Sequence, residues 1–116
     1  MRHRNKGRIL DRNRDSRQAL LRGLATSIII YEKVKTTNAK AKAVRPLVEK
    51  LVTLSKINNL TTRRRLTQVL YHKKAVNKSL EVLGPRYKDR KGGYTRITKV
   101  GNRQGDGAEV VQIEFI

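Results

Sequence analysis

The first regular hydrophobic pattern along the chain begins at Ala19 and predicts a helix. Its apolar positions lie on one helical face: Leu20, Leu21, Leu24, Ala25, Ile28, Ile29 and Tyr31. Asp15 is the expected N-cap, and Gln18, three residues later, completes a capping-box pattern. The β-branched run that follows predicts a short strand at residues 33–36.

A second hydrophobic pattern predicts a helix that ends near residue 55. Its apolar positions keep one register: Ala41, Val44, Val48, Leu51, Val52 and Ser55. Because this register passes Pro46 without slipping, we expect one helix, kinked where the proline removes a backbone hydrogen bond. A separate helix that begins at Arg45-Pro46 is the alternative. The candidate N-caps are Thr36, Thr37 and Asn38.

Two shorter patterns predict a third and a fourth helix. The apolar positions of the third are Leu66, Val69 and Leu70. Thr61 or Thr62 is its expected cap, which places the arginines at 63–65 in its opening turn, against the positive end of the helix dipole. A broken local rule of this kind often marks a functional site. The apolar positions of the fourth helix are Val76, Leu80 and Leu83, and we expect it to stop at Gly84-Pro85.

The last part of the chain predicts a β-hairpin. Residues 94–101 form an expected strand, and the three glycines at 101–107 indicate a turn. In the final segment, Val111, Ile113 and Phe115 alternate with polar residues, which is typical of a half-buried strand. With the strand at 33–36, the sequence predicts an α+β fold of about four helices and a small, mainly antiparallel sheet of about three strands.

Alternation separates the two faces of the first hairpin strand. Arg96 and Thr98 share a face with Tyr94, whereas Ile97 points to the other side, which we assign to the core. The adjacent glycines at 92–93 can adopt positive φ and let the backbone approach a phosphate closely. We expect the ring of Tyr94 to cover the edge of the core while its hydroxyl reaches a partner.

The first 17 residues are strongly basic. They contain seven Lys and Arg residues and two acids, and Ile9 and Leu10 are their only large aliphatic residues. Such a segment cannot bury itself, so we expect it to be disordered in the free protein and ordered on a partner; a disordered terminus without a specific role is the alternative. We divide the chain into an extended basic tail at 1–15 and a single domain at 16–116.

The composition favours a polyanionic partner over catalysis. With 28 Lys and Arg against nine Asp and Glu, the formal net charge is +19, and nucleic acid is the usual polyanion for a small basic chain. Cysteine is absent, His3 and His72 are the only histidines, and the acids form no close pair. We therefore expect no enzyme activity, metal site, cofactor or small-molecule substrate. No segment is long and apolar enough to span a bilayer, and no cleavable targeting peptide is evident, so we expect no membrane partner.

Basic residues gather in three clusters that form a candidate RNA-binding set. The set comprises Arg2, Arg4, Lys6, Arg8, Arg12, Arg14 and Arg17 in the tail, Arg63, Arg64 and Arg65 in the third helix, and Arg86, Tyr87, Lys88, Arg90, Lys91, Tyr94 and Arg96 in the loop before the hairpin and at its start. Guanidinium groups suit bidentate phosphate contacts. The two tyrosines can either stack on a base or pack within the protein. Because only five residues are aromatic, folded RNA recognised by shape and backbone is the expected partner.

Five segments carry a more specific signal. They are MRHR at 1–4, RNRDSR at 12–17, KTTNAKAKAVRPLVEKLVTL at 35–54, PRYKDRKGGYTRITKVG at 85–101 and GD at 105–106. In this order they resemble the L17 family of bacterial large-subunit ribosomal proteins. The resemblance implies a small α+β domain with an extended basic N-terminus, bound to large-subunit ribosomal RNA (rRNA) and beside other large-subunit proteins near the exit of the peptide tunnel, with no catalytic residues. The basic positions that it implies are Arg2, His3, Arg4, Lys6, Arg8, Arg12, Arg17, Arg86, Arg90, Tyr94 and Arg96.

Two other function classes share part of this signal. A histone-like DNA-binding protein would share the charge, but it should have a dimerising apolar surface or a recognition helix, and neither is evident. An RNA-modifying enzyme would need a cofactor loop or an acid–base group, and neither is present. We therefore predict a structural component of the ribosome that forms no homo-oligomer and is cytoplasmic rather than organellar.

Overall fold

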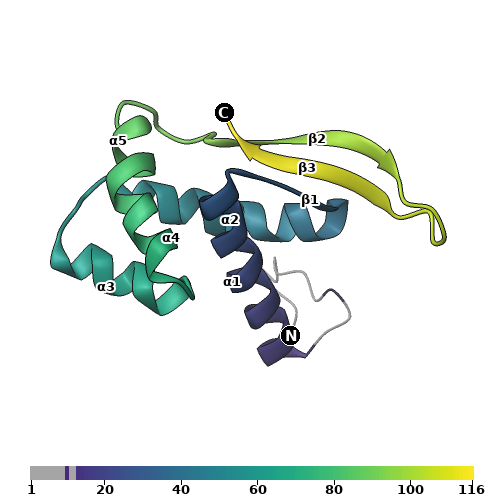
Figure 1. The fold of residues 1–116 in the computed structure, drawn as a ribbon, viewed down its shortest axis with the longest axis horizontal. Helices are drawn as coiled ribbons and strands as arrows, with labels where there is room; N and C mark the ends of the chain where they lie inside the picture. The colour runs from purple at the N-terminus through teal and green to yellow at the C-terminus, as the bar shows by residue number, and fades with distance from the viewer. Residues whose placement is uncertain (1–9, 11–12) are drawn as a thin grey trace, which may run out of the picture.

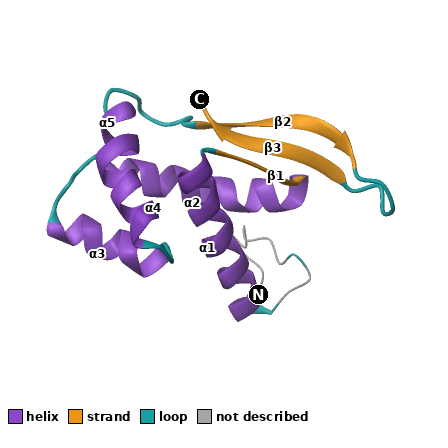
Figure 2. Cartoon of the chain, in the orientation of Figure 1, coloured by secondary structure: helices purple, strands orange, loops and turns teal. Residues whose placement is uncertain are grey.

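The computed structural model of the chain describes Leu10 and residues 13–116. Its elements, in chain order, are α1 (Arg14–Tyr31), β1 (Lys33–Thr37), α2 (Asn38–Ser55), α3 (Leu60–Val69), α4 (Lys73–Lys78), the π-helical turn η1 (Ser79–Leu83), α5 (Gly84–Arg86), β2 (Thr95–Asn102) and β3 (Glu109–Phe115) (Figure 1). α4, η1 and α5 follow one another without a break and form one helical segment. The helices lie beside a three-stranded sheet (Figure 2), which confirms the predicted α+β fold.

The sheet has the strand order β1-β3-β2, and both pairs of neighbouring strands are antiparallel. Ile113 in β3 lies opposite Val34 in β1 and Ile97 in β2. The buried positions of β3 are Val111, Ile113 and Phe115, as their alternation predicts. Helix α2 runs along the sheet and contacts all three strands (Figure 1). The predicted hairpin and its third strand are therefore confirmed.

Helix α2 is the central element of the fold, since it also contacts α1 and η1. It continues through Pro46 as a single helix, which decides between the two alternatives left by the sequence. Its buried positions are the six that the hydrophobic pattern gives: Ala41, Val44, Val48, Leu51, Val52 and Ser55. Its N-cap is Thr37, whose side chain makes no capping hydrogen bond.

Helix α1 begins earlier than the sequence suggested, because Asn13 caps it. The side-chain oxygen of Asn13 accepts a hydrogen bond of 2.9 Å from the Ser16 N–H, so the prediction of Asp15 as the cap is wrong. At the other end of the helix, Tyr31 is 71% exposed, so the prediction that it lies on the core-facing side is wrong. The helix ends there: the next residue, Glu32, takes a left-handed backbone conformation with a φ of 66°.

Helix α3 is likewise capped by an asparagine. The side-chain oxygen of Asn59 accepts from the Thr62 N–H at 2.8 Å, so Thr61 and Thr62 lie inside the helix and are not its caps. Because α3 begins at Leu60, Arg63 is its fourth residue, and the arginine triplet lies beyond the opening turn. The expected conflict with the helix dipole is correspondingly weaker, since that effect falls off within the first turn.

The helical segment at 73–86 passes through Gly84 and Pro85, so the predicted stop is wrong. Its expected apolar positions are buried: Val76, Leu80 and Leu83. The π turn η1 lies directly before Gly84 and widens the helix, which makes room for the ring of Pro85. Gly84 is itself helical and buried, and its missing side chain lets the segment lie against the backbone of Ser55 at the end of α2. Tertiary packing therefore overrides the local stop signal.

Candidate nucleic-acid interface

The basic loop, which we define as residues 86–96, runs from the last residue of α5 to the second residue of β2. Tyr87 fixes its first end. Tyr87 is 4% exposed, and its ring centroid lies 5.2 Å from that of Tyr94 and 6.1 Å from that of Phe115. Its hydroxyl donates a hydrogen bond of 2.7 Å to the carbonyl oxygen of Ile116. The start of the loop is therefore tied to the C-terminal end of the sheet.

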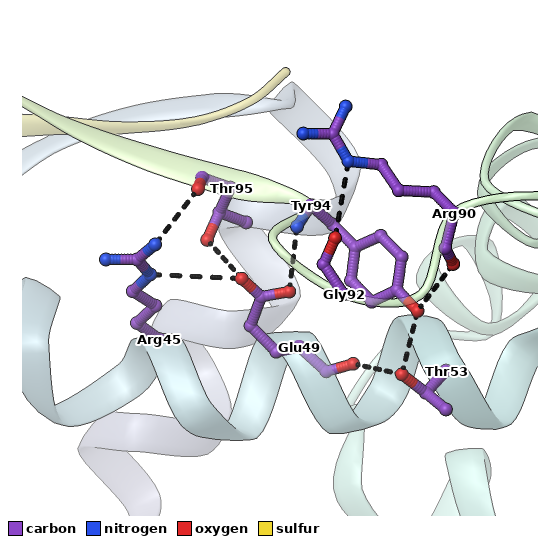
Figure 3. A network of polar contacts seen from close by, with 7 residues as sticks. All are labelled: Arg45, Glu49, Thr53, Arg90, Gly92, Tyr94 and Thr95. Carbon is purple, nitrogen blue, oxygen red and sulfur yellow. Dashed lines mark hydrogen bonds and ion pairs between the residues drawn. The ribbon is translucent and has the colours of Figure 1, made fainter.

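Helix α2 holds the far end of the loop through Glu49 (Figure 3). Its Oε2 accepts a hydrogen bond of 3.0 Å from the Tyr94 N–H, and its Oε1 accepts one of 3.1 Å from Thr95 Oγ1. One helical turn earlier, Arg45 lies with its Nε 3.8 Å from Glu49 Oε1 and donates to the Thr95 carbonyl oxygen at 3.3 Å. Both carboxylate oxygens of Glu49 are thus engaged where the loop enters β2.

The middle of the loop is bound to α2 at Arg90. The carbonyl oxygen of Arg90 accepts hydrogen bonds from the Lys56 ammonium group and, at 3.3 Å, from the Tyr94 hydroxyl. That hydroxyl also lies 3.1 Å from Thr53 Oγ1 (Figure 3). The Lys56 ammonium group lies 5.0 Å from the centroid of the Tyr94 ring. The inner side of the loop is therefore held by contacts with Thr53 near the end of α2 and with Lys56 directly after that helix.

The side chains that the loop presents to solvent are mainly cationic. Lys88, Arg90 and Lys91 are exposed, and neither lysine forms an ion pair within the described part of the chain. Gly92 and Gly93 have φ angles of 128° and 62°, so the predicted positive φ is confirmed at both. A fixed backbone that carries exposed cations reduces the ordering cost of binding an anion.

Tyr87 and Tyr94 pack within the protein, which decides against stacking on a base. Tyr94 is 1% exposed, and its hydroxyl is directed at Thr53 and Arg90 and not outward. The expectation that Tyr94 shares an exposed face with Arg96 is wrong, because Tyr94 precedes β2 and its side chain lies between the loop and α2. Both tyrosines position the loop.

Arg86 is engaged within the protein. Its guanidinium group and the Lys78 ammonium group both bind the carboxylate of Glu32, the residue that follows α1. The hydrogen bond from Arg86, opposed by partial burial and aided by Lys78, lowers the pKa of Glu32 from 4.5 to about 2. Sequence analysis missed Glu32 because its two partners lie 46 and 54 residues later in the chain.

The arginine triplet of α3 forms a separate cluster. Figure 1 shows α3 and the basic loop at opposite ends of the segment formed by α4, η1 and α5. Arg63 donates to Asn77 Oδ1 at 2.8 Å, whereas the arginines at 64–65 are exposed. Lys73 and Lys74 are also exposed at the start of α4, which contacts α3. The predicted RNA-binding set omitted these two lysines, although two consecutive lysines in the sequence could have indicated a basic cluster there.

The outer face of the sheet carries further cations. The register places Lys33 of β1 and Arg96 of β2 on either side of Glu114 of β3. Arg96 Nε donates to Glu114 Oε1 at 2.9 Å, and this hydrogen bond lowers the pKa of Glu114. Lys35 is exposed two residues along β1, on the same face as Lys33. Alternation in the segment KVKTT could have indicated both lysines, which the predicted set lacks.

Most residues of the predicted tail lie outside the described residues: Arg2, His3, Arg4, Lys6, Arg8 and Arg12. Arg14 and Arg17 are described, and both lie near the start of α1, where Arg14 is exposed and Arg17 is partly buried. The expected disorder of the free tail and its ordering on a partner remain predictions.

The acids of the described chain serve mainly to hold its structure. Five of them pair with Lys or Arg: Glu32, Glu49, Asp106, Glu109 and Glu114. Within Leu10 and residues 13–116, no three His, Asp or Glu side chains gather as a metal site would require. In the same part of the chain, no helix has the length and apolar character to cross a membrane.

Two substitutions on β2 distinguish its faces. We expect Arg96→Ala to weaken rRNA binding while changing the melting temperature little, because Arg96 is exposed and surface ion pairs contribute little. We expect Ile97→Ala to lower the free energy of unfolding by about 1–2 kcal/mol and to leave binding unchanged, since Ile97 is partly buried against the core. Thermal melting and rRNA binding of both variants check this, and the reverse pattern would show that the faces are exchanged.

Comparison with known proteins gives a consistent picture. Residues 20–116 match the family model described as Ribosomal protein L17. The chain is 50% identical over 116 residues to the large ribosomal subunit protein bL17 of Rickettsia bellii (strain OSU 85-389), a match that covers all of this chain and 82% of that protein. It is 47% identical over 117 residues to the protein of the same name from Hydrogenobaculum sp. (strain Y04AAS1), covering all of this chain and 99% of that protein. With the bL17 of Exiguobacterium sp. (strain ATCC BAA-1283 / AT1b), it is 51% identical over 112 residues, or 92% of this chain and 96% of that one.

Proposed function

The chain belongs to the ribosomal protein L17 family, and from this premise we propose that it binds and stabilises folded large-subunit rRNA through its Arg and Lys clusters. A member of this family is a structural component of the ribosome and not an enzyme. We further propose that the protein lies near the exit of the peptide tunnel, beside other large-subunit proteins, and supports translation in the cytoplasm. This finer placement rests on the family resemblance of its motifs.

The basic loop is the observation that carries the proposal. Glu49 and Lys56 bind its backbone from the inside, and Thr53 lies within hydrogen-bond distance of the Tyr94 hydroxyl. Lys88 and Lys91 are exposed on it. Phosphate contacts supply much of the affinity of RNA-binding surfaces, and a preformed row of cations suits them. Because the two tyrosines of the loop are buried, the loop offers no aromatic platform on which successive bases of a single strand could stack. This favours folded RNA that is recognised mainly by its backbone and shape.

We propose that the tail meets the domain between Arg12 and Asn13. The division after residue 15 would cut α1, which begins at Arg14 and is capped by Asn13. In this arrangement the tail, the arginines of α3 and the basic loop are three separate contacts of one domain. Because α3 and the loop lie at opposite ends of the helical segment at 73–86 (Figure 1), they should reach different parts of the rRNA.

The salt dependence of rRNA affinity tests the proposal. If about 6 to 10 phosphates are neutralised, the logarithm of the binding constant should fall with the logarithm of the salt concentration, by roughly 0.7–0.9 per contact. Filter binding of the full chain to deproteinised large-subunit rRNA over a range of salt concentrations measures this slope. A nearly flat dependence would contradict phosphate-dominated binding.

Glu49→Ala tests whether a preformed loop matters. The substitution removes a negative charge beside the proposed interface, so electrostatics alone predicts tighter binding. We expect binding about tenfold weaker, because the Tyr94 N–H and the Thr95 hydroxyl lose their acceptor and the loop must then be ordered during association.

Asp89→Asn is the matched control in the same binding assay, because it removes the same charge from an exposed position of the loop. It should leave binding unchanged or slightly tighter. Tighter binding by both variants would show that charge alone governs the affinity of this surface.

A further inference from the structure

A shallow groove of about 410 Å³ lies between α2 and the end of the basic loop. Its walls are Glu49, Lys50, Thr53 and Leu54 on the helix and residues 92–94 on the loop; we call it the loop groove. We propose that the loop groove holds the base of one unpaired nucleotide of the rRNA. This inference rests on the rRNA binding proposed above and names one nucleotide contact of that same surface.

The size and lining of the groove suit a single base. Its volume lies at the lower end of the roughly 300–1,000 Å³ of small-ligand sites. Leu54 is partly buried against the core and supplies fixed apolar surface on the helix side. Tyr94, almost wholly buried at the other side, fixes the position of the loop wall. The bases of an RNA helix are stacked inside it, and an unpaired base can turn outward into such a space.

The two glycines leave the loop side of the groove bare. A methyl group added to Gly92 or Gly93 would meet no protein atom within 4 Å, so neither glycine is required by packing inside the protein. Gly84 differs, since a methyl group there would strike the backbone of Ser55. At 92–93 the backbone therefore lies uncovered, and a flat group can approach it closely.

Charge favours a nucleotide over an acidic or apolar protein segment. Lys50 on the groove wall and Lys91 beside Gly92 are exposed cations. Glu49 is the only acid lining the groove, and both its oxygens already accept hydrogen bonds from Tyr94 and Thr95. An apolar space bordered by cations matches a flat base joined to its phosphates. An acidic peptide would use the cations but not the apolar lining, and an apolar peptide would use the lining but not the cations.

Base-specific chemical probing of deproteinised large-subunit rRNA with the full chain tests the inference. We expect the wild-type protein to protect one or a few unpaired bases. Leu54→Trp, which fills the groove, should restore their reactivity and weaken binding about fivefold, with an unchanged salt slope because the cations remain.

Lys50→Glu should also restore the reactivity, and its exposed position keeps the test valid if Leu54→Trp does not fold. Lys42→Glu is the matched control, because it makes the same charge change at an exposed position of α2 outside the groove. It should weaken binding but leave the base protections in place.

Several outcomes would overturn the inference. Wild-type protein that binds the rRNA without protecting any unpaired base would leave the proposed function standing and remove this contact. Protections that persist in both groove variants would do the same. If subunits reconstituted with the groove variants lost a neighbouring ribosomal protein while the base protections stayed unchanged, the groove would be assigned to a protein segment. Wild-type protein that fails to bind rRNA at all would overturn the proposed function itself.

Discussion

Replacing Gly84 with alanine is expected to destabilise the domain by about 2–3 kcal/mol, although alanine is the better helix former. A methyl group at Gly84 would lie 3.0 Å from the carbonyl carbon of Ser55, closer still to its oxygen, and 3.3 Å from the carbonyl oxygen of Ser79. Backbone atoms cannot rotate away as a flexible side chain can, so α2 and the helical segment at 73–86 must move apart. Urea or thermal unfolding measures the change.

Gly23→Ala is the matched control for this prediction. Gly23 also lies within a helix, but a methyl group there would meet only a ring carbon of Tyr71, at 4.0 Å. Helix propensity should therefore act alone and stabilise the domain by about 1 kcal/mol. If Gly84→Ala were stabilising as well, the close contact between the two helices would not exist in solution.

Periodicity predicted those elements whose environment repeats along the chain. Helix α2 is packed on one side along its whole length, so its hydrophobic register gave every buried position and carried through Pro46. Strand β3 lies between two other strands with one face on the core, which is the situation in which apolar and polar residues alternate. In both cases each residue's burial follows from its position in the repeat.

Local signals failed where a distant segment decides the outcome. The Gly84-Pro85 pair has the composition of a helix stop, yet Gly84 is there because Ser55, 29 residues earlier, packs against it. The N-caps of α1 and α3 were predicted at the wrong residues because several polar residues lie near the start of each helix. The cap is the one whose backbone is extended where the helix begins, Asn13 in α1 and Asn59 in α3. Neither the packing partner nor the backbone angle is visible in a short stretch of sequence.

The candidate site divides in the same way. Its cations and its positive-φ glycines could be predicted from the local sequence, because clusters of charged residues and pairs of glycines are visible in a short stretch of chain. The residues that hold the loop could not, since Glu49 binds the Tyr94 N–H from 45 positions away. Other long-range contacts bury the two tyrosines that the sequence left open as stacking groups: Tyr87 packs against Phe115 and binds the Ile116 carbonyl oxygen, and Tyr94 lies beside Thr53.

Deleting residues 2–12 is expected to weaken rRNA binding by roughly 100-fold at moderate salt, because it removes up to five phosphate contacts. The deleted segment contains five Lys and Arg residues and one acid. The salt slope should fall by about 0.7–0.9 for each phosphate that the shortened protein no longer neutralises. Asn13 remains to cap α1, so the free energy of unfolding should change by less than about 0.5 kcal/mol.

Asn13→Ala in the full chain makes the opposite change and completes the test of the tail. It removes the cap of α1 and should cost about 1 kcal/mol of stability, while all the cations of the tail remain. Chemical denaturation and rRNA binding of the two variants should therefore separate: the deletion should affect binding alone, and the substitution should affect stability alone. A deletion that lowered stability more than Asn13→Ala would show that residues 2–12 contribute to the core, and the proposed boundary between Arg12 and Asn13 would then be wrong.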